Sequence, residues 1–139
     1  MLRGIFALAA GLFAAMIVIT GMELVSAKWL YPLPPGFDAS QPAQVRAFVS
    51  AMPAWAHACI LGGWLLGALA GGSVAGRLET RYPWLPATLV GTFVAAGTWM
   101  NAQAIPHPAW VLAPGVLLPV PLALLGARLF RRVSPAPGN

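Results

Sequence analysis

The sequence predicts an all-α protein, an integral membrane four-helix bundle with both termini in the cytoplasm. Three observations lead to this prediction. Hydrophobic residues make up 59% of the 139 residues and charged residues only 8%, whereas a soluble domain carries about a quarter charged residues. Four stretches are mainly apolar over roughly the 20 residues that a helix needs to cross the hydrocarbon of a bilayer. Most basic residues gather at one end of these stretches.

The first predicted span covers residues 5–30. Arg3, the apolar run and the small residues near Ser26 together imitate a secretory signal with its cleavage site. The apolar run from Ile5 to Met22 is longer than the usual core of such a signal. We therefore expect a retained membrane anchor.

The loop between the first two spans, residues 32–52, is the only long connection, and we expect it to face outward. It opens with residues that forbid a helix and favour an extended turn: Pro32, Pro34, Pro35 and Gly36. Ser40 is then expected to cap a short helix. Apolar residues recur there at the spacing of one helical face: Val45, Phe48, Val49 and Met52. We predict an amphipathic helix on the outer membrane surface, with an irregular loop as the alternative.

The second and third predicted spans cover residues 53–76 and 84–105. The second carries glycine at every fourth position, at Gly63, Gly67 and Gly71. Such a ridge without side chains lets another helix approach closely, and we expect it to pack helices within one chain. A dimer interface is the alternative interpretation.

The fourth predicted span covers residues 109–130 and contains Pro114, Pro119 and Pro121. Each proline lacks a backbone N–H and clashes with the preceding turn, so this helix should be kinked. Residues 134–139 hold two prolines and a glycine and are expected to form a disordered tail. Residues 1–133 thus form the single predicted transmembrane domain.

The ends of the spans are marked by aromatic and basic residues. Amphipathic rings prefer membrane interfaces, and six lie near the predicted ones: Trp29, Tyr31, Trp55, Trp84, Trp99 and Trp110. Only Trp64 is expected to be internal. One side of the membrane carries most of the arginines: Arg3, Arg77, Arg81, Arg128, Arg131 and Arg132. Lys28 and Arg46 lie on the other side, so the positive-inside rule places both termini in the cytoplasm.

Glu23 is one of three acidic residues, and it lies near the outer end of the first span. At about 1.5 Å per helical residue it lies about 30 Å above Arg3, at the outer edge of the hydrocarbon. Its face of the helix is small and polar, so we expect a partner from another helix. The candidates for an outer polar cluster beneath the Pro-rich loop are Glu23, His57, Asn101, Gln103 and His107. Ordinary structural hydrogen bonding is the alternative for each.

Several classes of site are not predicted. The two histidines are far apart in sequence, so no metal or haem site is expected. No serine–histidine–aspartate set and no phosphate-binding glycine loop is present, so no catalytic residue and no cofactor is predicted. The lone Cys59 cannot form an internal disulfide and is expected to be a small apolar core residue. The few scattered basic residues give no basis for nucleic-acid binding.

The stretch ELVSAKWLYPLPPGFD, followed by the glycine-rich second span, resembles a loose group of small four-helix bacterial membrane proteins. That group has a glutamate before a Tyr-Pro pair and a Pro-Gly-x-Asp turn. The resemblance covers the first half of the chain and implies a bacterial inner-membrane location and no activity. Small multidrug exporters also have four short helices, but they carry their essential glutamate within the first span, whereas Glu23 lies near a boundary.

The sequence therefore predicts a non-enzymatic small membrane protein, either an accessory subunit of a membrane complex or a self-associating bundle. Its expected partners are membrane lipids and other membrane subunits or further copies of itself. The alternative is a small carrier or channel that uses the polar cluster around Glu23. Ion-coupled transport normally requires ionisable groups near the midplane, which the spans lack. A third and weaker alternative is a membrane enzyme acting on a lipid or quinone.

Overall fold

The computed structural model describes residues 2–130, and helices are the only regular secondary structure in this part of the chain. Its elements are α1 (Leu2–Val25), the π-helical turn η1 (Ser26–Leu30), α2 (Pro42–Ser50), α3 (Ala54–Leu78), α4 (Trp84–Ala104), α5 (Ala109–Leu117) and α6 (Pro119–Leu129). The predicted all-α class is confirmed. The predicted tail, residues 134–139, and the basic residues Arg131 and Arg132 lie outside the described residues.

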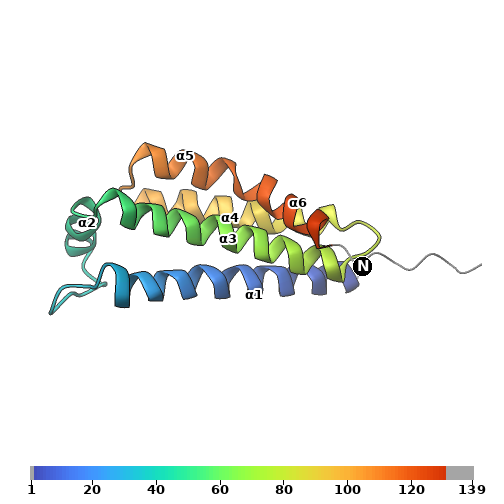
Figure 1. Ribbon diagram of the computed structural model, residues 1–139, viewed down its shortest axis with the longest axis horizontal. Coiled ribbons are helices and arrows are strands. Elements are labelled where there is room, and N and C mark those ends of the chain that lie inside the picture. The colour runs from blue at the N-terminus through green and yellow to red at the C-terminus, as the bar shows by residue number, and fades with distance from the viewer. Residues whose placement is uncertain (1, 131–139) are drawn as a thin grey trace, which may run out of the picture.

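The long helices lie side by side, and α2 lies across one end of them (Figure 1). Helix α3 occupies the central position, because it packs against α1, α4 and α6. The end that carries α2 is called the cap end here. The opposite end holds the start of α1 and the connection between α3 and α4, and it is called the arginine end (Figure 1).

Two helices among the described residues, α1 extended through η1 and α3, are each long and apolar enough to cross a membrane. They correspond to the predicted spans 5–30 and 53–76. Helices α5 and α6 meet the same criterion together as one bent span. Helix α4 has 21 residues and no charged side chain, but it falls short of the required hydropathy. Two or three helices of this kind fit a membrane protein.

The predicted kink in the last helix is confirmed, and it lies at Leu118. Helices α5 and α6 meet there at an angle of 45°. Pro119 starts α6, where its missing N–H is tolerated because the first helical turn lacks partners anyway. Pro114 lies inside α5 and its carbonyl accepts the Leu118 N–H at 3.0 Å. The chain thus changes direction without leaving the Leu118 N–H unpaired.

The glycines of α3 lie where neighbouring helices come closest. A Cβ atom on Gly71 would lie 2.6 Å from the carbonyl oxygen of Gly11 in α1. A Cβ on Gly67 would lie 2.5 Å from Ile19, and one on Gly63 3.0 Å from Met22. The ridge Gly63, Gly67 and Gly71 therefore faces α1 within the same chain. Its absence of side chains is what permits this separation.

A second small-residue face of α3 contacts α6. A Cβ on Gly76 would lie 2.7 Å from the Cα of Ala127, and one on Gly72 would lie closer still to the backbone of Ala123. Helix α4 approaches α6 through Gly91, where a Cβ would lie 2.6 Å from the Cα of Val120. Helices α3 and α4 thus meet α1 or α6 through positions that no larger residue could occupy without a shift of neighbouring atoms.

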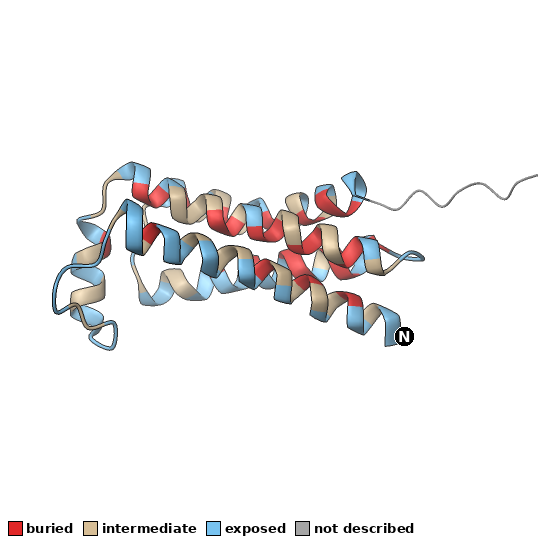
Figure 2. Cartoon of the chain, turned by 60° about the horizontal axis from the view of Figure 1, so that its bottom comes forward, coloured by how far each residue is buried: buried red, intermediate tan, exposed pale blue. Residues whose placement is uncertain are grey.

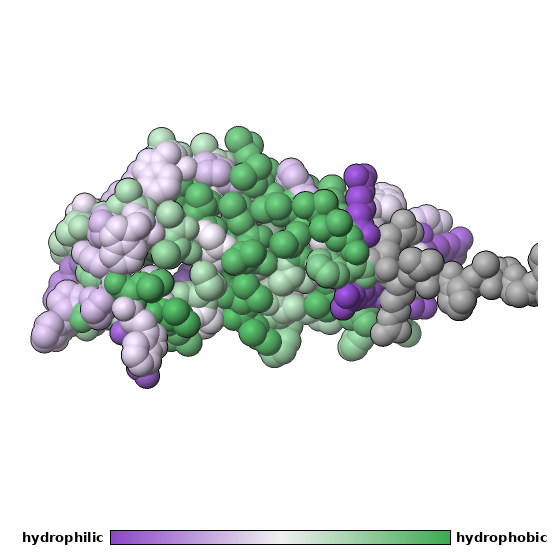
Figure 3. Space-filling view, in the orientation of Figure 1, coloured by the Kyte–Doolittle hydropathy of each residue, from purple (hydrophilic) through white to green (hydrophobic). Residues whose placement is uncertain are grey.

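Burial and polarity are distributed unevenly along the bundle. More of the buried residues lie in the half of the bundle at the arginine end, where the N-terminus is marked (Figure 2). A hydrophobic band covers the middle of the visible surface, with more hydrophilic residues toward both ends (Figure 3). This pattern is typical of a protein whose middle faces lipid.

Two arginines tie the helix ends together at the arginine end. Arg3 donates from Nε to the Leu78 carbonyl at 2.6 Å, at the last residue of α3. Arg77 donates from Nε to the Phe130 carbonyl at 2.9 Å, directly after α6. The last carbonyls of a helix lack partners within the helix, and basic side chains satisfy them well. These arginines therefore stabilise the bundle in addition to carrying positive charge.

Candidate functional site

The segment that joins η1 to α3, residues 31–53, forms a cap over one end of the bundle. Gly36 makes its turn with a φ of +76°, a conformation that strongly favours glycine. The Phe37 N–H donates to the Pro34 carbonyl at 3.1 Å. Pro42 then begins α2, where a proline is compatible with the first turn. The predicted short helix is confirmed, with one buried side chain, Val49.

The predicted capping role of Ser40 is wrong. Gln41 is the N-cap residue of α2, and no side chain caps the helix there. Ser40 instead donates its N–H at 2.9 Å and its hydroxyl at 2.7 Å to Oδ1 of Asp38. Gln41 donates from Nε2 to Oδ2 of Asp38 at 3.1 Å. An aspartate two residues earlier thus competes successfully for the Ser40 hydroxyl, as is common in turns.

These hydrogen bonds also fix the charge of Asp38. The bonds from the Ser40 hydroxyl and N–H, followed by the bond from Gln41, hold the pKa of the Asp38 carboxyl below its usual value. Hydrogen bonds that are donated to a carboxylate favour its ionised form. Asp38 therefore carries a negative charge at neutral pH and acts as the acceptor that orders this turn.

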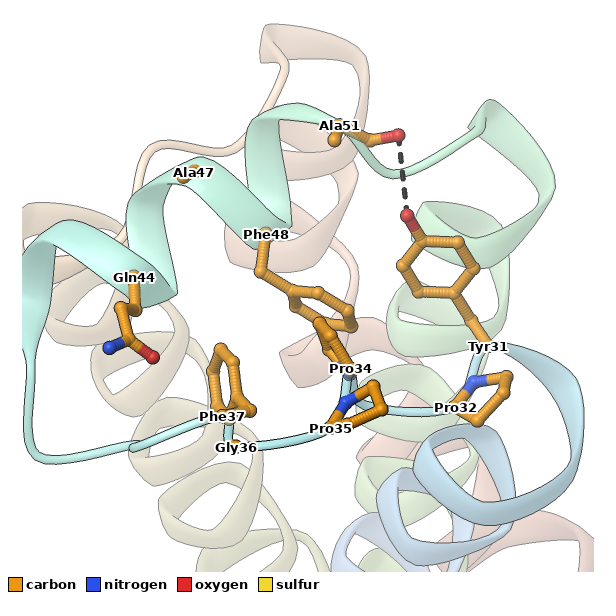
Figure 4. Close-up of a pocket in the computed structure, with 10 residues that line it drawn as sticks. All are labelled: Tyr31, Pro32, Pro34, Pro35, Gly36, Phe37, Gln44, Ala47, Phe48 and Ala51. Atoms are coloured by element: carbon orange, nitrogen blue, oxygen red, sulfur yellow. Dashed lines mark hydrogen bonds between the residues drawn. The ribbon is translucent and has the colours of Figure 1, made fainter.

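A cup of aromatic and proline side chains lies on the cap (Figure 4). These side chains line an open pocket of about 710 Å³. The ring centroids of Tyr31 and Phe48 are 5.0 Å apart, and those of Phe37 and Phe48 are 5.3 Å apart. Tyr31 also donates its hydroxyl to the Ala51 carbonyl at 3.4 Å. The rings bind the proline loop to α2, and no charged side chain lines the cup.

Two further cavities lie beneath the cap and between α1 and α4. The under-cap cavity, about 300 Å³, is lined by Ser26, Met52 and His107 among others. The interhelix cavity, about 210 Å³, is lined mainly by apolar residues and by the Trp64 ring. Glu23 from α1 and Asn101 from α4 line both cavities. The two cavities therefore adjoin at this pair of polar side chains.

Each histidine has one ring nitrogen bonded to the backbone. Nδ1 of His107 lies 2.8 Å from the Ile105 carbonyl oxygen, and Nδ1 of His57 lies 3.3 Å from that of Pro53. A carbonyl only accepts, so each Nδ1 must carry a proton, and Nε2 is an acceptor wherever the ring is neutral. Burial lowers the pKa of His107, so its ring is neutral at pH 7.

The two imidazoles lie beside each other. Their ring centroids are 6.2 Å apart and their planes are nearly perpendicular, at 87°. His57 is buried, and its Nε2 has no hydrogen-bond partner among residues 2–130. His57 and His107 share an open pocket with Trp110. His107 thus connects this pocket to the under-cap cavity.

The structure brings some of the predicted cluster together and leaves one member out. Glu23, Asn101 and His107 line the under-cap cavity, and His57 lies next to His107. Gln103 is exposed and lines neither the under-cap nor the interhelix cavity. It follows Asn101 by two residues, which turns it about 200° around α4, away from the bundle.

Sequence analysis did not assign Trp64 to this site. Trp64 is buried, as expected for an internal residue, but it also lines the interhelix cavity together with Glu23. Its ring centroid lies 5.5 Å from that of His107. The spacing could have indicated this position. Trp64 follows His57 by seven residues, about two helical turns, and therefore shares its face of α3.

The remaining predicted positions have simple surroundings. The tryptophans assigned to interfaces expose about half or more of their surface, from 48% at Trp110 to 73% at Trp29. Tyr31 is half-buried in the aromatic cup. Cys59 is a free thiol of intermediate burial. Within the described part of the chain, no three histidine, cysteine or acidic side chains are placed to hold a metal ion.

No protein-family model, curated protein or solved structure matches this chain.

Replacing Asp38 with alanine should loosen the turn before α2, because three donors lose their acceptor. We expect the amides of residues 37–44 to exchange faster with deuterium, as measured by mass spectrometry and corrected for intrinsic rates. The pKa of Asp38 is lowered in the folded state, so its ordering effect is present above the usual value of 3.8 and is lost as the pH falls through the folded value.

The matched control for this experiment is Ser50→Ala. This variant removes only the Ser50 hydroxyl bond to the Ala47 carbonyl within α2. It should leave exchange across residues 37–44 unchanged. Equal exchange rates in Asp38→Ala, Ser50→Ala and the wild type would show that Asp38 does not order the turn.

Proposed function

We propose that this chain is a non-enzymatic, multi-pass protein of the bacterial inner membrane that acts by associating with other membrane subunits or with itself. In this proposal α1, α3, α4 and the bent pair α5–α6 are four spans, both termini are cytoplasmic, and α2 lies on the outer membrane surface. The arginines at one end of the bundle support this orientation, since basic residues are enriched on the cytoplasmic side.

The outward face of α1 is the observation that carries the proposal. It exposes large apolar side chains: Ile5 at 65%, Phe6 at 65%, Phe13 at 69%, Ile17 at 56% and Leu24 at 65%. Only 22% of the most apolar 18-residue stretch of this helix is buried, compared with 39% for the same measure in α3. Helix α1 therefore uses a narrow face within the bundle and leaves a wide face for lipid or for another helix.

Apart from its exposed helix faces, the described chain offers little to a partner. The connections between α3 and α4 and between α4 and α5 are short, and the cap is the only larger segment outside the long helices. Gly21 lies on α1 with no atom within 4 Å of the place where its Cβ would be. A gap of this kind on a lipid-facing helix allows a second helix to approach.

Association should depend on the outward face of α1. We expect the protein purified in mild detergent to elute as an oligomer or with other membrane proteins, by light scattering and mass spectrometry. Gly21→Leu should fill the gap and reduce association at least several-fold while the thermal stability of the chain is kept, because no atom of residues 2–130 lies within 4 Å of its Cβ position.

Gly62→Leu is the matched control, because Gly62 of α3 also has no atom within 4 Å of its Cβ position. It should leave association unchanged. A wild-type protein that is monomeric and free of partners in several mild detergents would contradict the proposal. Equal losses in both variants would show that α1 is not the contact face.

The orientation is tested by labelling single cysteines in cells, in a Cys59→Ala background. Ala43→Cys in α2 should react with a membrane-impermeant thiol reagent added outside, because both the position and the cap are exposed. Thr80→Cys, exposed at the arginine end, should react only after the membrane is permeabilised. The reverse pattern would overturn the proposed orientation.

A small carrier or channel is the second candidate function. The observation that favours it is the position of Glu23, which lines two adjoining cavities rather than packing against a single partner. Ionisable groups within apolar spans commonly mark the paths of ions or substrates. Glu23 lies close to the cap end of α1, so such a path would begin near that surface.

A further inference from the structure

The walls of the two adjoining cavities are rich in hydrogen-bond acceptors. An ionised Glu23 carboxylate only accepts hydrogen bonds. His107 offers Nε2 as an acceptor, because its Nδ1–H is used by the Ile105 carbonyl. The residues that line the under-cap and interhelix cavities include one carboxylate and neither lysine nor arginine. A ligand that satisfies these groups must donate hydrogen bonds, and a positive charge would complement Glu23.

Away from Glu23 and Asn101, the interhelix cavity is lined mainly by apolar residues, and it is open at the side. Its lining includes Met16 and Phe93, which are 48% and 56% exposed on the outside of α1 and α4. Gly97 has no atom within 4 Å of its Cβ position, which leaves the α4 wall hollow there. An apolar chain can therefore enter between α1 and α4 and reach Glu23 without crossing the bundle.

We propose that the joined cavities bind a lipophilic ammonium compound, with its apolar chain in the interhelix cavity and its charged nitrogen at Glu23. Its N–H groups would be donated to the Glu23 carboxylate, to the Asn101 side-chain oxygen and to Nε2 of His107. The Trp64 ring lines the same cavity and supplies a face that attracts cations.

Charge decides between this ligand and other amphiphiles. An anionic headgroup would meet the Glu23 carboxylate with no basic side chain in the lining to offset the repulsion. A neutral alcohol would donate one hydrogen bond and leave the carboxylate without a counter-charge, which is costly near hydrocarbon. The ammonium group is the one that satisfies both the charge and the acceptors.

The site is distinct from the association surface proposed above. It lies between α1 and α4, whereas the association surface is the outward face of α1 around Phe13 and Gly21. Ligand binding therefore needs no partner subunit, and either proposal can fail while the other holds.

The direct test is calorimetric titration of the protein in nanodiscs of zwitterionic lipid, with empty nanodiscs subtracted. The probes are decylammonium, decanol and decanoate, which share one chain and differ in charge. We expect saturable binding of decylammonium, at least ten-fold weaker binding of decanol and no saturable binding of decanoate. Equal affinity for decanol or decanoate would overturn the proposal.

The affinities of two variants and one control test whether decylammonium binds in the joined cavities. Glu23→Gln should weaken decylammonium binding at least ten-fold. Gly97→Leu should also weaken it, because the new side chain enters the space for the ligand chain while Glu23 is kept. Glu79→Gln is the control, since Glu79 lies at the arginine end and its carboxylate accepts the Arg81 N–H at 2.8 Å.

The outcome does not depend on a single variant. Gly97 lies in open space, so Gly97→Leu should fold even if Glu23→Gln does not. Wild-type affinity in Gly97→Leu would overturn the proposed place of the chain, and wild-type affinity in a folded Glu23→Gln would overturn the role of the carboxylate. A Glu79→Gln variant that binds as weakly as Glu23→Gln would show general adsorption to the protein instead of a site.

Discussion

The close approach of other backbones to α3 is the constraint on which the rest of the structure depends. In lipid, burial of apolar side chains contributes little to helix association. Tight van der Waals packing must therefore hold the helices together. Gly71 permits this against Gly11 of α1, and Gly76 permits it against Ala127 of α6. Because α1 is fixed in this way, Glu23 lies at the α1–α4 boundary beside Trp64. The glycines that bring α1 and α3 together therefore also determine where the polar site forms.

The bundle is tight at one end and looser at the other, and the candidate site lies at the looser end. At the arginine end, Arg3 and Arg77 bind the carbonyls at the ends of α3 and α6. The bend at Leu118 separates the closely packed α6 from α5, which makes fewer contacts with α3. Larger rings and the cap fill the space that remains, and they leave the cavities near His57 and His107. The chain is therefore closely packed at the arginine end and holds its cavities near the cap end.

Local chemistry made the helices and the kink predictable, whereas contacts between distant segments decided the rest. Apolar length alone located α1 and α3, and the three prolines of the last span predicted its bend without fixing its position. Ser40 was assigned to the wrong partner, because Asp38 competes for its hydroxyl through a turn that helix patterns do not reveal. The position of Glu23 along α1 could be counted from the sequence. That Trp64 lies beside it depends on which face of α3 meets α1, and the sequence did not show this. Gln103 shows the same limit, since height alone could not tell that it faces outward.

The most direct measurement of the central constraint compares the unfolding free energies of Gly71→Ala and Gly62→Ala in one detergent. Both add a single methyl group to α3, but a Cβ at Gly71 meets the Gly11 backbone, whereas one at Gly62 meets nothing within 4 Å. Gly71→Ala should lower the unfolding free energy by about 1–3 kcal/mol, the usual effect of overpacking. Gly62→Ala should be neutral or stabilising by about 0.5–1 kcal/mol, because alanine favours a helix over glycine. A Gly71→Ala protein as stable as Gly62→Ala would contradict the account.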